Sequence, residues 1–339
     1  MAPMAIERVT IRSVAERAGV SPATVSLVLN QRPGVRISDA TRERVMRAAG
    51  ELDYAPNRIA RSLAHGRTHL IGVIVPDLSN AFYADIVDGI EAAAAERQLH
   101  VLLAHSRDDA ATEQSQVRLL MEQQVDGLVC MVADGTAAHC REWLPAATAQ
   151  GLACVIVDEL DPGVAVDCIA SDDELGARLA TEHLLARGHR RIALLAAGQG
   201  RSSARARLRG WRMALAAAGI AEDPALIAGT SYRTDQAVEA VERLLAQRPQ
   251  AVLACSDQLA AVLIDRVAQA GLAIPHDVAV VGYANDRYLA PALGLTSVDQ
   301  ASRQIGRHAL ELLMQRMATP DGPAERIMLP PSLVVRRSG

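Results

Sequence analysis

The sequence contains no lysine: all 35 basic residues of the 339-residue chain are arginine. This absence excludes P-loop ATPases, Schiff-base enzymes and kinase-type catalysis, because each of these classes depends on a lysine amine. Long hydrophobic runs are also missing, and none approaches the roughly 18 residues that a membrane span needs. The start, MAPMAIERVT, lacks the apolar core of a secretory signal. We therefore expect a cytoplasmic protein with no membrane partner.

Cysteine is sparse, and the motifs of common catalytic sites are missing. The five cysteines are odd in number and form no CxxC pair, which is typical of reduced thiols in a hydrophobic core. There is no GxSxG, no HExxH and no paired-cysteine zinc spacing. A Gly-x-Gly at 198–200 resembles the start of a dinucleotide fingerprint, but Ser203 stands where its third glycine belongs. We therefore expect that the protein is not an enzyme and that it binds neither a cofactor nor a metal.

Charge divides the chain into a basic head and an acidic body. Residues 1–67 carry 11 arginines against 6 acidic residues, whereas residues 68–339 carry 24 arginines against 33 acidic residues. Such a head favours contact with a polyanion, although small helical domains are often rich in arginine for other reasons. The chain is long enough for two or three domains.

The head shows the pattern of three short helices. Residues 11–18 place apolar side chains on one helical face behind a candidate N-cap, Thr10. Gly19 then breaks the helix, and Ser21-Pro22 begins a second one, which buries apolar residues at 25, 28 and 29. A third helix is expected from about 38 to 52. Two short helices joined by a glycine turn form a helix-turn-helix unit, and the outward residues of the second helix are small or polar, which suits approach to phosphates and base edges.

The string TIRSVAERAGVSPATVSLVLN, followed by ELDYAPNRIARSLA at 51–64, resembles the head of the LacI/GalR family of bacterial transcription regulators. This resemblance implies a head at 8–56 and a segment at 57–67 that becomes a hinge helix on operator DNA, where Leu63 wedges into the minor groove. One departure is Leu27, where many relatives that read G·C carry arginine. Leucine can contact a thymine methyl group but cannot hydrogen-bond to guanine, so the base sequence of the operator is not predicted. The expected DNA contacts are Thr10, Ser21, Pro22, Ala23, Thr24, Ser26, Leu27, Asn30, Asn57, Ala60 and Leu63.

The body alternates strand-length apolar runs with helical stretches. Strands are predicted at 70–75, 100–104, 127–132, 152–158, 191–196, 251–255 and 278–282, with helices near 83–97 and 112–124. This alternation predicts an α/β body of parallel sheets, and two such series indicate two Rossmann-like lobes. Ligands of such sheets bind beyond the carboxyl ends of the strands. Several of the few aromatic residues, Phe82 and Tyr83 among them, fall in the predicted loops there.

The resemblance extends over the body, through RGHRRIALLA, SSARARLRGW, SDQLAAV and VAVVGY, and implies a core like periplasmic sugar-binding proteins. It divides the body, 68–339, into an N-lobe of about 68–161 plus 293–322 and a C-lobe of about 162–292 plus 323–339. An effector is expected between the lobes. The residues expected to bind it are Phe82, Tyr83, Asp158, Ser203, Arg207, Tyr232, Ser256, Asp257 and Asn285.

The chemistry of the effector stays open between a sugar and a sugar acid or sugar phosphate. Relatives that bind sugars usually carry Asp where this chain has Ala284, and that carboxylate grips sugar hydroxyls. Five arginines, which bind carboxylate and phosphate well, crowd the same region, although they could also lie on a solvated helix face. They are Arg201, Arg205, Arg207, Arg209 and Arg233.

Taken together, these observations predict a transcriptional regulator, expected to be a repressor acting in the bacterial nucleoid. Its operator affinity is expected to be controlled by a small molecule. Inducer and corepressor cannot be told apart at this stage. The alternative is a cytosolic small-molecule receptor that does not bind an operator. A homodimer is expected because operators of this kind have two half-sites, with 83–98 and 112–124 as candidate interface segments. A last strand is predicted at SLVV, 332–335, and no leucine heptads follow it, so we expect no tetramer.

Overall fold

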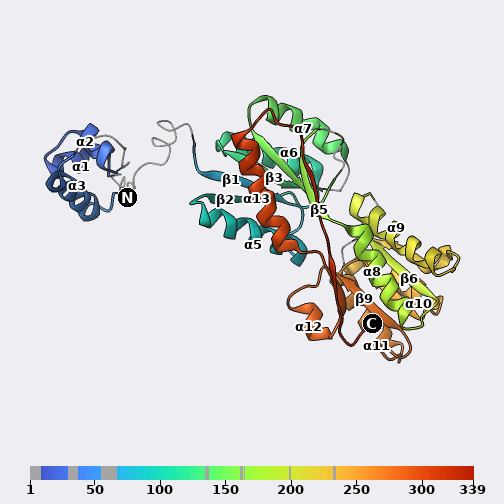
Figure 1. Ribbon diagram of the computed structural model, residues 1–339. Coiled ribbons are helices and arrows are strands. Elements are labelled where there is room, and N and C mark those ends of the chain that lie inside the picture. Colours follow the sequence, from blue (N-terminus) through green and yellow to red (C-terminus); the bar gives the residue numbers. More distant parts are fainter. Residues whose placement is uncertain are drawn as a thin grey trace, which may run out of the picture. The chain divides into compact units, whose positions relative to one another are not determined.

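The computed structural model describes residues 9–29, 37–54, 67–133, 137–160, 163, 165–197, 200–231 and 234–339 (Figure 1). The chain forms two compact units, which divide between Thr68 and His69. Within the described residues, no helix is long and apolar enough to cross a membrane. The small all-α head and the α/β body of two lobes confirm the expected fold class.

The head consists of α1 (Ile11–Ala18), α2 (Pro22–Leu29) and α3 (Asp39–Glu51). Thr10 caps α1 in a reciprocal capping box with Ser13, and Gly19 ends this helix with a left-handed φ of 65°. The Ser21 hydroxyl accepts a bond from the Thr24 amide at the start of α2. These caps fix the sharp turn between α1 and α2, which confirms the predicted helix-turn-helix.

The head has its own small core, made by one apolar stripe from each helix. Its fully buried members are Val14, Ala15, Ala18, Val25, Val28, Val45, Ala48 and Ala49. An ion pair between Arg17 and Glu51 joins α1 to α3 at the surface. The head therefore holds together through contacts among its own helices.

The N-lobe is built on a sheet whose described strands are all parallel, in the order β11-β5-β4-β3-β1-β2. The strands are β1 (Leu70–Val75), β2 (His100–His105), β3 (Gly127–Met131), β4 (Ala153–Val157), β5 (Asp167–Ser171) and β11 (Arg326–Leu329). Side chains of a strand alternate between faces. Accordingly, Ile71, Val73 and Val75 face one core while Ile74 faces another.

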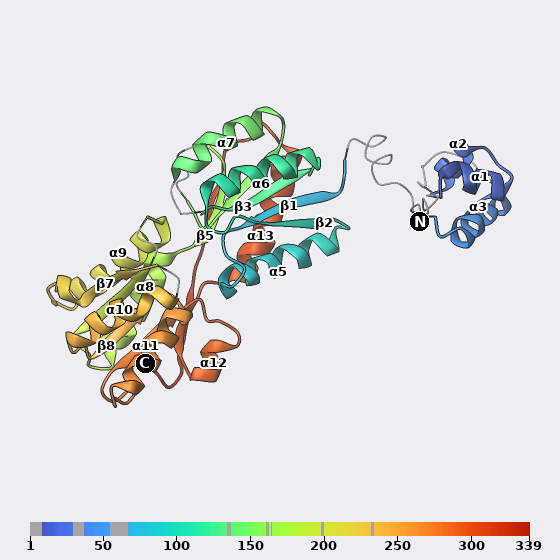
Figure 2. The ribbon, with the colours of Figure 1, turned by 180° about the vertical axis from the view of Figure 1, so that it is seen from behind.

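Helices α5 (Ala81–Glu96) and α13 (Ser302–Ala318) cover one face of this sheet, and α6 (Ala110–Glu122) and α7 (Ala137–Ala149) cover the other (Figures 1 and 2). Two glycines let α5 and α13 pack closely. A Cβ added at Gly306 would collide with the Ile86 carbonyl, and one at Gly89 would collide with the Arg303 carbonyl. The helices are thus in backbone contact, which a larger residue at either glycine would prevent.

The C-lobe repeats this plan with a sheet in the order β12-β10-β9-β8-β6-β7, in which β12 is antiparallel to β10. Helix α8 packs against α9, and α10 packs against α11. The strands are β6 (Ile192–Ala197), β7 (Ile227–Thr230), β8 (Ala251–Ala254), β9 (Ala279–Tyr283), β10 (Thr296–Asp299) and β12 (Ser332–Val334). The helices are α8 (Asp173–Ala186), α9 (Ser202–Ala217), the 3₁₀ turn η2 (Pro224–Leu226), α10 (Thr234–Ala246), α11 (Asp257–Gln269) and α12 (Leu289–Leu293).

The lobe boundaries differ from those expected. The described chain crosses between the sheets after β5, after β10 and after β11, whereas the expected crossings were at 161/162, 292/293 and 322/323. Each crossing comes later because the strand before it pairs with the sheet that the chain is about to leave. Strand β5 therefore belongs to the N-lobe, β10 to the C-lobe and β11 to the N-lobe.

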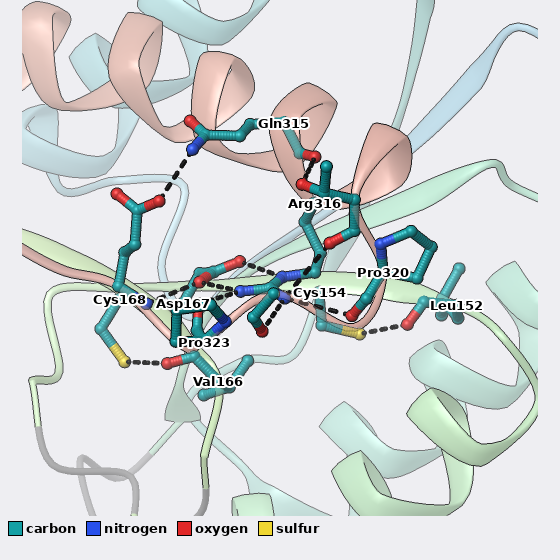
Figure 3. Close-up of polar contacts among 12 residues, drawn as sticks. Leu152, Cys154, Val166, Asp167, Cys168, Gln315, Arg316, Pro320 and Pro323 are labelled. Atoms are coloured by element: carbon teal, nitrogen blue, oxygen red, sulfur yellow. Dashed lines mark hydrogen bonds and ion pairs between the residues drawn. The ribbon is translucent and has the colours of Figure 1, made fainter.

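The segment between α13 and β11 is held by a buried ion pair (Figure 3). Arg316 of α13 donates two hydrogen bonds of 2.7 Å to the carboxylate of Asp167, at the start of β5. The same guanidinium bonds the carbonyls of Pro320 and Pro323. In return, the Asp167 carboxylate accepts the amide of Glu325. One arginine thus fixes the loop that delivers β11 to the sheet.

All five cysteines are buried and unbonded to one another, as expected. In β4 and β5, the thiols of Cys154 and Cys168 donate to carbonyls two residues earlier in the chain (Figure 3). Burial raises the pKa of Cys154 to about 12, so this thiol stays protonated. These cysteines behave as small core residues.

Candidate functional site: a DNA-facing helix and an interlobe site

The outward face of α2 carries no charged side chain. Ser21, Pro22 and Ala23 are exposed, while Thr24, Ser26 and Leu27 are half-buried. Leu27 is absent from the apolar cluster that fills the head. It therefore lies on the outer side of the helix, where it was expected to meet a base edge.

Part of the expected DNA-contact set lies outside the described residues: Asn30, Asn57, Ala60 and Leu63, together with most of the 57–67 hinge. Thr10 is described, and its side chain caps α1, where it bonds the Ser13 amide at 3.4 Å. The Ser21 hydroxyl likewise bonds within α2. These two residues hold the ends of the helices that would approach DNA.

In the body, Arg207 of α9 is buried and bonds two groups of its own lobe. Its Nε donates to Asp173 Oδ1 at 2.9 Å, and its Nη1 donates to the Cys255 carbonyl at 2.8 Å. The guanidinium also lies over the ring of Tyr283, 4.0 Å from the centroid. These contacts fix the arginine at the carboxyl ends of the C-lobe strands, the edge where ligands of such sheets bind.

Asp173 is the centre of this cluster. It is 4 % exposed and stands at the start of α8, immediately after the chain leaves β5. Besides Arg207, its Oδ1 accepts a bond of 3.3 Å from Gln300, which follows β10. The Tyr283 hydroxyl donates to the Asp173 backbone carbonyl. Two of the three crossings between the lobes thus deliver a side chain to one cluster.

Arg201, just before α9, contacts the opposite lobe. Its Nη1 donates to the Tyr83 hydroxyl at 3.2 Å and to the Val132 carbonyl at 3.3 Å, and its Nη2 pairs with Asp108. Only 9 % of the Arg201 side chain is exposed. This arginine therefore joins the carboxyl ends of the two sheets.

Asp158 follows β4 in a left-handed conformation, with a φ of 66°. Its Oδ1 is buried and has no hydrogen-bond partner among the described residues. Burial raises the pKa of Asp158 to about 7, and the negative charge of Asp173 adds to the rise, while Arg207 and Arg201 oppose it. A strained backbone and an unsatisfied acceptor in one residue are typical of a binding site.

Two serine hydroxyls close to these strand ends are also buried without a hydrogen-bond partner in the described part of the chain. They belong to Ser203, in the first turn of α9, and Ser171, the last residue of β5. We call Tyr83, Asp158, Asp173, Arg201, Ser203 and Arg207 the interlobe site. It combines two paired arginines with acceptors and hydroxyls that still have bonding capacity.

Three other residues expected to bind effector are engaged within the C-lobe. The Ser256 hydroxyl caps α11. The Asp257 carboxylate accepts the Ser297 hydroxyl and the Asp286 amide, both at 2.6 Å. Asn285, with a φ of 49°, bonds Asp299 and Arg336 through its side chain. The bonds of Asp257 and Asn285 hold the loop after β9, and Ser256 holds the start of α11.

The aromatic residues are placed differently from the expectation. The loop after β1 was expected to run to residue 83, but Asn80 caps α5, so Phe82 and Tyr83 lie in the first turn of that helix. Both are 6 % exposed and belong to the N-lobe core, with ring centroids 5.3 Å apart. Only the Tyr83 hydroxyl is seen at the interlobe site. Tyr232, the expected aromatic wall, lies outside the described residues.

The five arginines do not act as one group. Arg201 and Arg207 are buried and each is paired with a carboxylate. Arg205 and Arg209 are exposed on the outer side of α9, where Arg209 pairs with Glu174. Arg233 lies outside the described residues. The arginines that favoured an anionic effector therefore fall into two groups: some are exposed to solvent, and others form internal ion pairs.

Two protein-family models match parts of this chain. Residues 10–57 match the model of bacterial regulatory proteins of the lacI family, and residues 181–339 match a periplasmic binding protein-like domain. The ribose operon repressor of Haemophilus influenzae is 35 % identical over 335 residues, which cover 97 % of this chain and 98 % of that protein. The chain belongs to the lacI family of bacterial regulatory proteins.

Other members support this assignment. The repressor PurR of Vibrio atlanticus is 33 % identical over 96 % of this chain and 97 % of its own length. A lac repressor dimer bound to operator and an anti-inducer matches with a TM-score of 0.88 at 31 % identity, over 98 % of this chain and 99 % of that one. A LacI family regulator of Enterococcus faecium with bound ribose matches at 0.71 and 27 % identity, over 79 % of this chain and 98 % of that one.

This LacI-family member is accordingly a DNA-binding transcriptional regulator controlled by a small molecule, and the alternative of a receptor without an operator is not favoured. Its relatives are repressors and not enzymes. Asp173 and Gln300 were not among the expected site residues, because they follow two strands, β5 and β10, that were not predicted. A signal was available, because a short apolar stretch followed by an acid or amide marks the carboxyl end of a strand.

Proposed function

We propose that this regulator represses transcription as a homodimer on a pseudo-palindromic operator, and that a neutral, hydroxyl-rich effector at the interlobe site releases it. The head supplies one recognition helix, α2, to each half-site. The relative named as a ribose operon repressor and the lac repressor dimer bound to operator support this function. The proposed operator contacts are those expected from sequence, with Leu63 at the centre.

The chemistry of the interlobe site favours a neutral effector over an anionic one. Arg201 and Arg207 are each matched by a carboxylate, Asp108 and Asp173. Asp158 adds a third carboxyl group whose Oδ1 has no hydrogen-bond partner in the described residues. An anion would have to displace an internal partner from an arginine and would also meet Asp158. A hydroxyl donates to a carboxylate without either cost.

The proposal of a neutral effector rests mainly on the Asp158 oxygen that has no hydrogen-bond partner among the described residues. Together with the buried hydroxyl of Ser203, it offers one acceptor and one group that can donate or accept. Solved family members hold sugars: one is a complex with cellobiose and another has bound ribose. Ribose and cellobiose are therefore the first candidates for this chain.

Operator binding is tested with the full chain and labelled DNA from upstream of its own gene. Fluorescence anisotropy is expected to show saturable binding that survives an excess of random DNA and weakens steeply with salt. Light scattering should give a mass near twice the 36.1 kDa of the chain. Equal affinity for operator and random DNA would contradict the proposed function.

The effector is sought by thermal shift with ribose, cellobiose, ribose 5-phosphate and gluconate. A ligand at 100 times its Kd stabilises the folded protein by about 2.7 kcal/mol, which is readily measured. We expect a neutral sugar to raise Tm and to release operator. Stabilisation by the phosphate or the acid alone would contradict a neutral effector.

A further inference from the structure

Two arginines join the lobes in the described part of the body, and they differ in burial. Arg201 of the C-lobe is 9 % exposed and contacts Tyr83, Val132 and Asp108, which all belong to the N-lobe. Arg287, in the loop after β9, is 38 % exposed and pairs with Asp85 and Asp88 of α5. Arg207, by comparison, bonds Asp173 and the Cys255 carbonyl of its own lobe.

The loop that presents Asp108 is strained. Arg107 and Asp108 follow β2 with φ angles of 57° and 56°, and neither is glycine. Consecutive left-handed residues other than glycine are strained and persist where surrounding contacts compensate for the strain. Asp109 caps α6 directly afterwards, through a 2.7 Å bond to the Thr112 amide. The backbone thus turns sharply and places the Asp108 carboxylate against the opposite lobe.

We propose that Arg201 is a latch that holds the two lobes in their closed arrangement before any effector binds. Its guanidinium makes three bonds that exist only while the lobes are together, so they stabilise the closed state relative to an open one. The bonds to Tyr83 and Val132 are buried and therefore shielded from water, whereas the Asp108 side chain is 50 % exposed, so its ion pair adds less. The Arg287 tie rests on a guanidinium that is 38 % exposed, and exposed ion pairs contribute little.

The latch makes Arg201 a positioning residue of the interlobe site. Closure brings Tyr83 and Asp158 of the N-lobe towards Ser203 and Arg207 of the C-lobe, so the site exists before the effector arrives. An effector then gains affinity because it does not have to close the lobes itself. The geometry of the latch does not depend on the proposed function, whereas its effect on operator binding rests on that function.

The test measures the distance between the lobes in the full chain without effector or DNA. One label is placed in each lobe through Glu122→Cys on α6 and Met213→Cys on α9, both exposed positions. The native thiols should not compete, since all five are buried. Double electron–electron resonance then reports the distance distribution. We expect one closed population for the otherwise unchanged protein.

Arg201→Ala should lower the ratio of closed to open molecules by about tenfold, and Asp108→Asn should lower it by less, because the bonds to Tyr83 and Val132 remain. The double variant should do no more than Arg201→Ala alone, because both changes break the same pair. Arg201→Lys should restore part of the closed population. Arg287→Ala should change the ratio by less than about fivefold. The control is Arg205→Ala, since within the described residues this exposed arginine bonds the Gly200 carbonyl of its own lobe.

Unchanged distances in Arg201→Ala, or a predominantly open body before any substitution, would overturn the latch. Operator affinity is measured on the same proteins by anisotropy. A longer distance with unchanged operator affinity would contradict the coupling in the proposed function and leave the latch standing. The two failures are therefore distinguishable.

Discussion

The two lobes share one topology and divide the chemistry of the site between them. Strands β11-β5-β4-β3-β1-β2 of the N-lobe correspond in order to β12-β10-β9-β8-β6-β7 of the C-lobe. In the C-lobe, the charged groups at the strand ends satisfy one another, as Arg207 does with Asp173 and Asp257 with Ser297. In the N-lobe, Asp158 keeps an unsatisfied oxygen. A duplicated fold can thus pair the charged groups of one lobe with one another and leave a carboxyl oxygen unpaired in the other lobe.

The largest expected effect comes from breaking the pair of buried charges in the C-lobe. Arg207→Ala leaves the Asp173 carboxylate buried without its cation, and such a loss costs about 3–5 kcal/mol. We expect urea unfolding to show this decrease, together with loss of effector binding. The double variant Arg207→Met, Asp173→Asn should recover much of the stability but not the effector response. A fully stable Arg207→Ala protein would show that the pair is not structural.

A smaller effect is expected from the helix contact of the N-lobe. Gly306→Ala places a methyl group against the Ile86 carbonyl, and overpacking of this kind costs about 1–3 kcal/mol. The matched control is Gly50→Ala in α3, where nothing lies within 4 Å of the added atom. There the better helix propensity of alanine should stabilise the head by up to about 1 kcal/mol. Calorimetry of both variants checks the opposite signs.

Asp158→Asn tests the unpaired carboxyl group of the N-lobe through the pH dependence of stability and effector binding. The folded pKa of about 7 lies above the ordinary value of 3.8, so the folded state holds the proton more tightly than the unfolded state. Stability from this group is therefore present at low pH and is lost as pH rises from about 4 to 7. Asparagine tolerates the left-handed backbone and removes the loss.

The variant should consequently be more stable than the parent at pH 8 and similar to it near pH 4, while binding effector more weakly. In the parent, effector affinity should fall as pH drops below 7, since protonation replaces the strongly accepting carboxylate with a weaker acceptor. Thermal melts and ligand titrations from pH 5 to 8 provide both measurements. A parent protein with pH-independent affinity would contradict Asp158 as the acceptor.

The smallest effect is expected from an exposed arginine on α9. Arg209→Ala breaks a surface pair with Glu174, where the arginine is 56 % exposed, so the free energy of unfolding should change by no more than about 1 kcal/mol. Effector and operator affinities should stay unchanged. A loss of effector response would place the site on the outer face of α9 and reverse the comparison between buried and exposed arginines.

Most of the fold follows from periodicity in the sequence. Runs such as LIGVIV and GLVCMV are apolar throughout because both faces of their strands are buried, and the predicted bounds hold to within one or two residues. The three strands that were missed, β5, β10 and β11, are short or carry polar residues, as in DCIAS and TSVD. All three precede a crossing, which explains why the lobe boundaries were wrong.

The site was less predictable because its geometry depends on partners distant in sequence. The importance of Arg207 was visible in the ARxR pattern, but its pairing with Asp173, 34 residues earlier, was not. Arg201 was counted among the cations, yet nothing local shows that it reaches Tyr83, 118 residues away. Residues 82 and 83 were assigned to a loop because the cap at Asn80 was not recognised.

The three crossings between the lobes have a consequence for synthesis on the ribosome. The N-lobe sheet is complete only when β11, ending at Leu329, has been made, and the C-lobe sheet needs β12 just beyond it. The head, by contrast, has its own core within residues 14–49. At 5–20 residues per second, the head leaves the ribosome roughly 15–55 s before either lobe can be completed. For that interval a nascent chain carries a folded DNA-binding module with no body able to sense an effector.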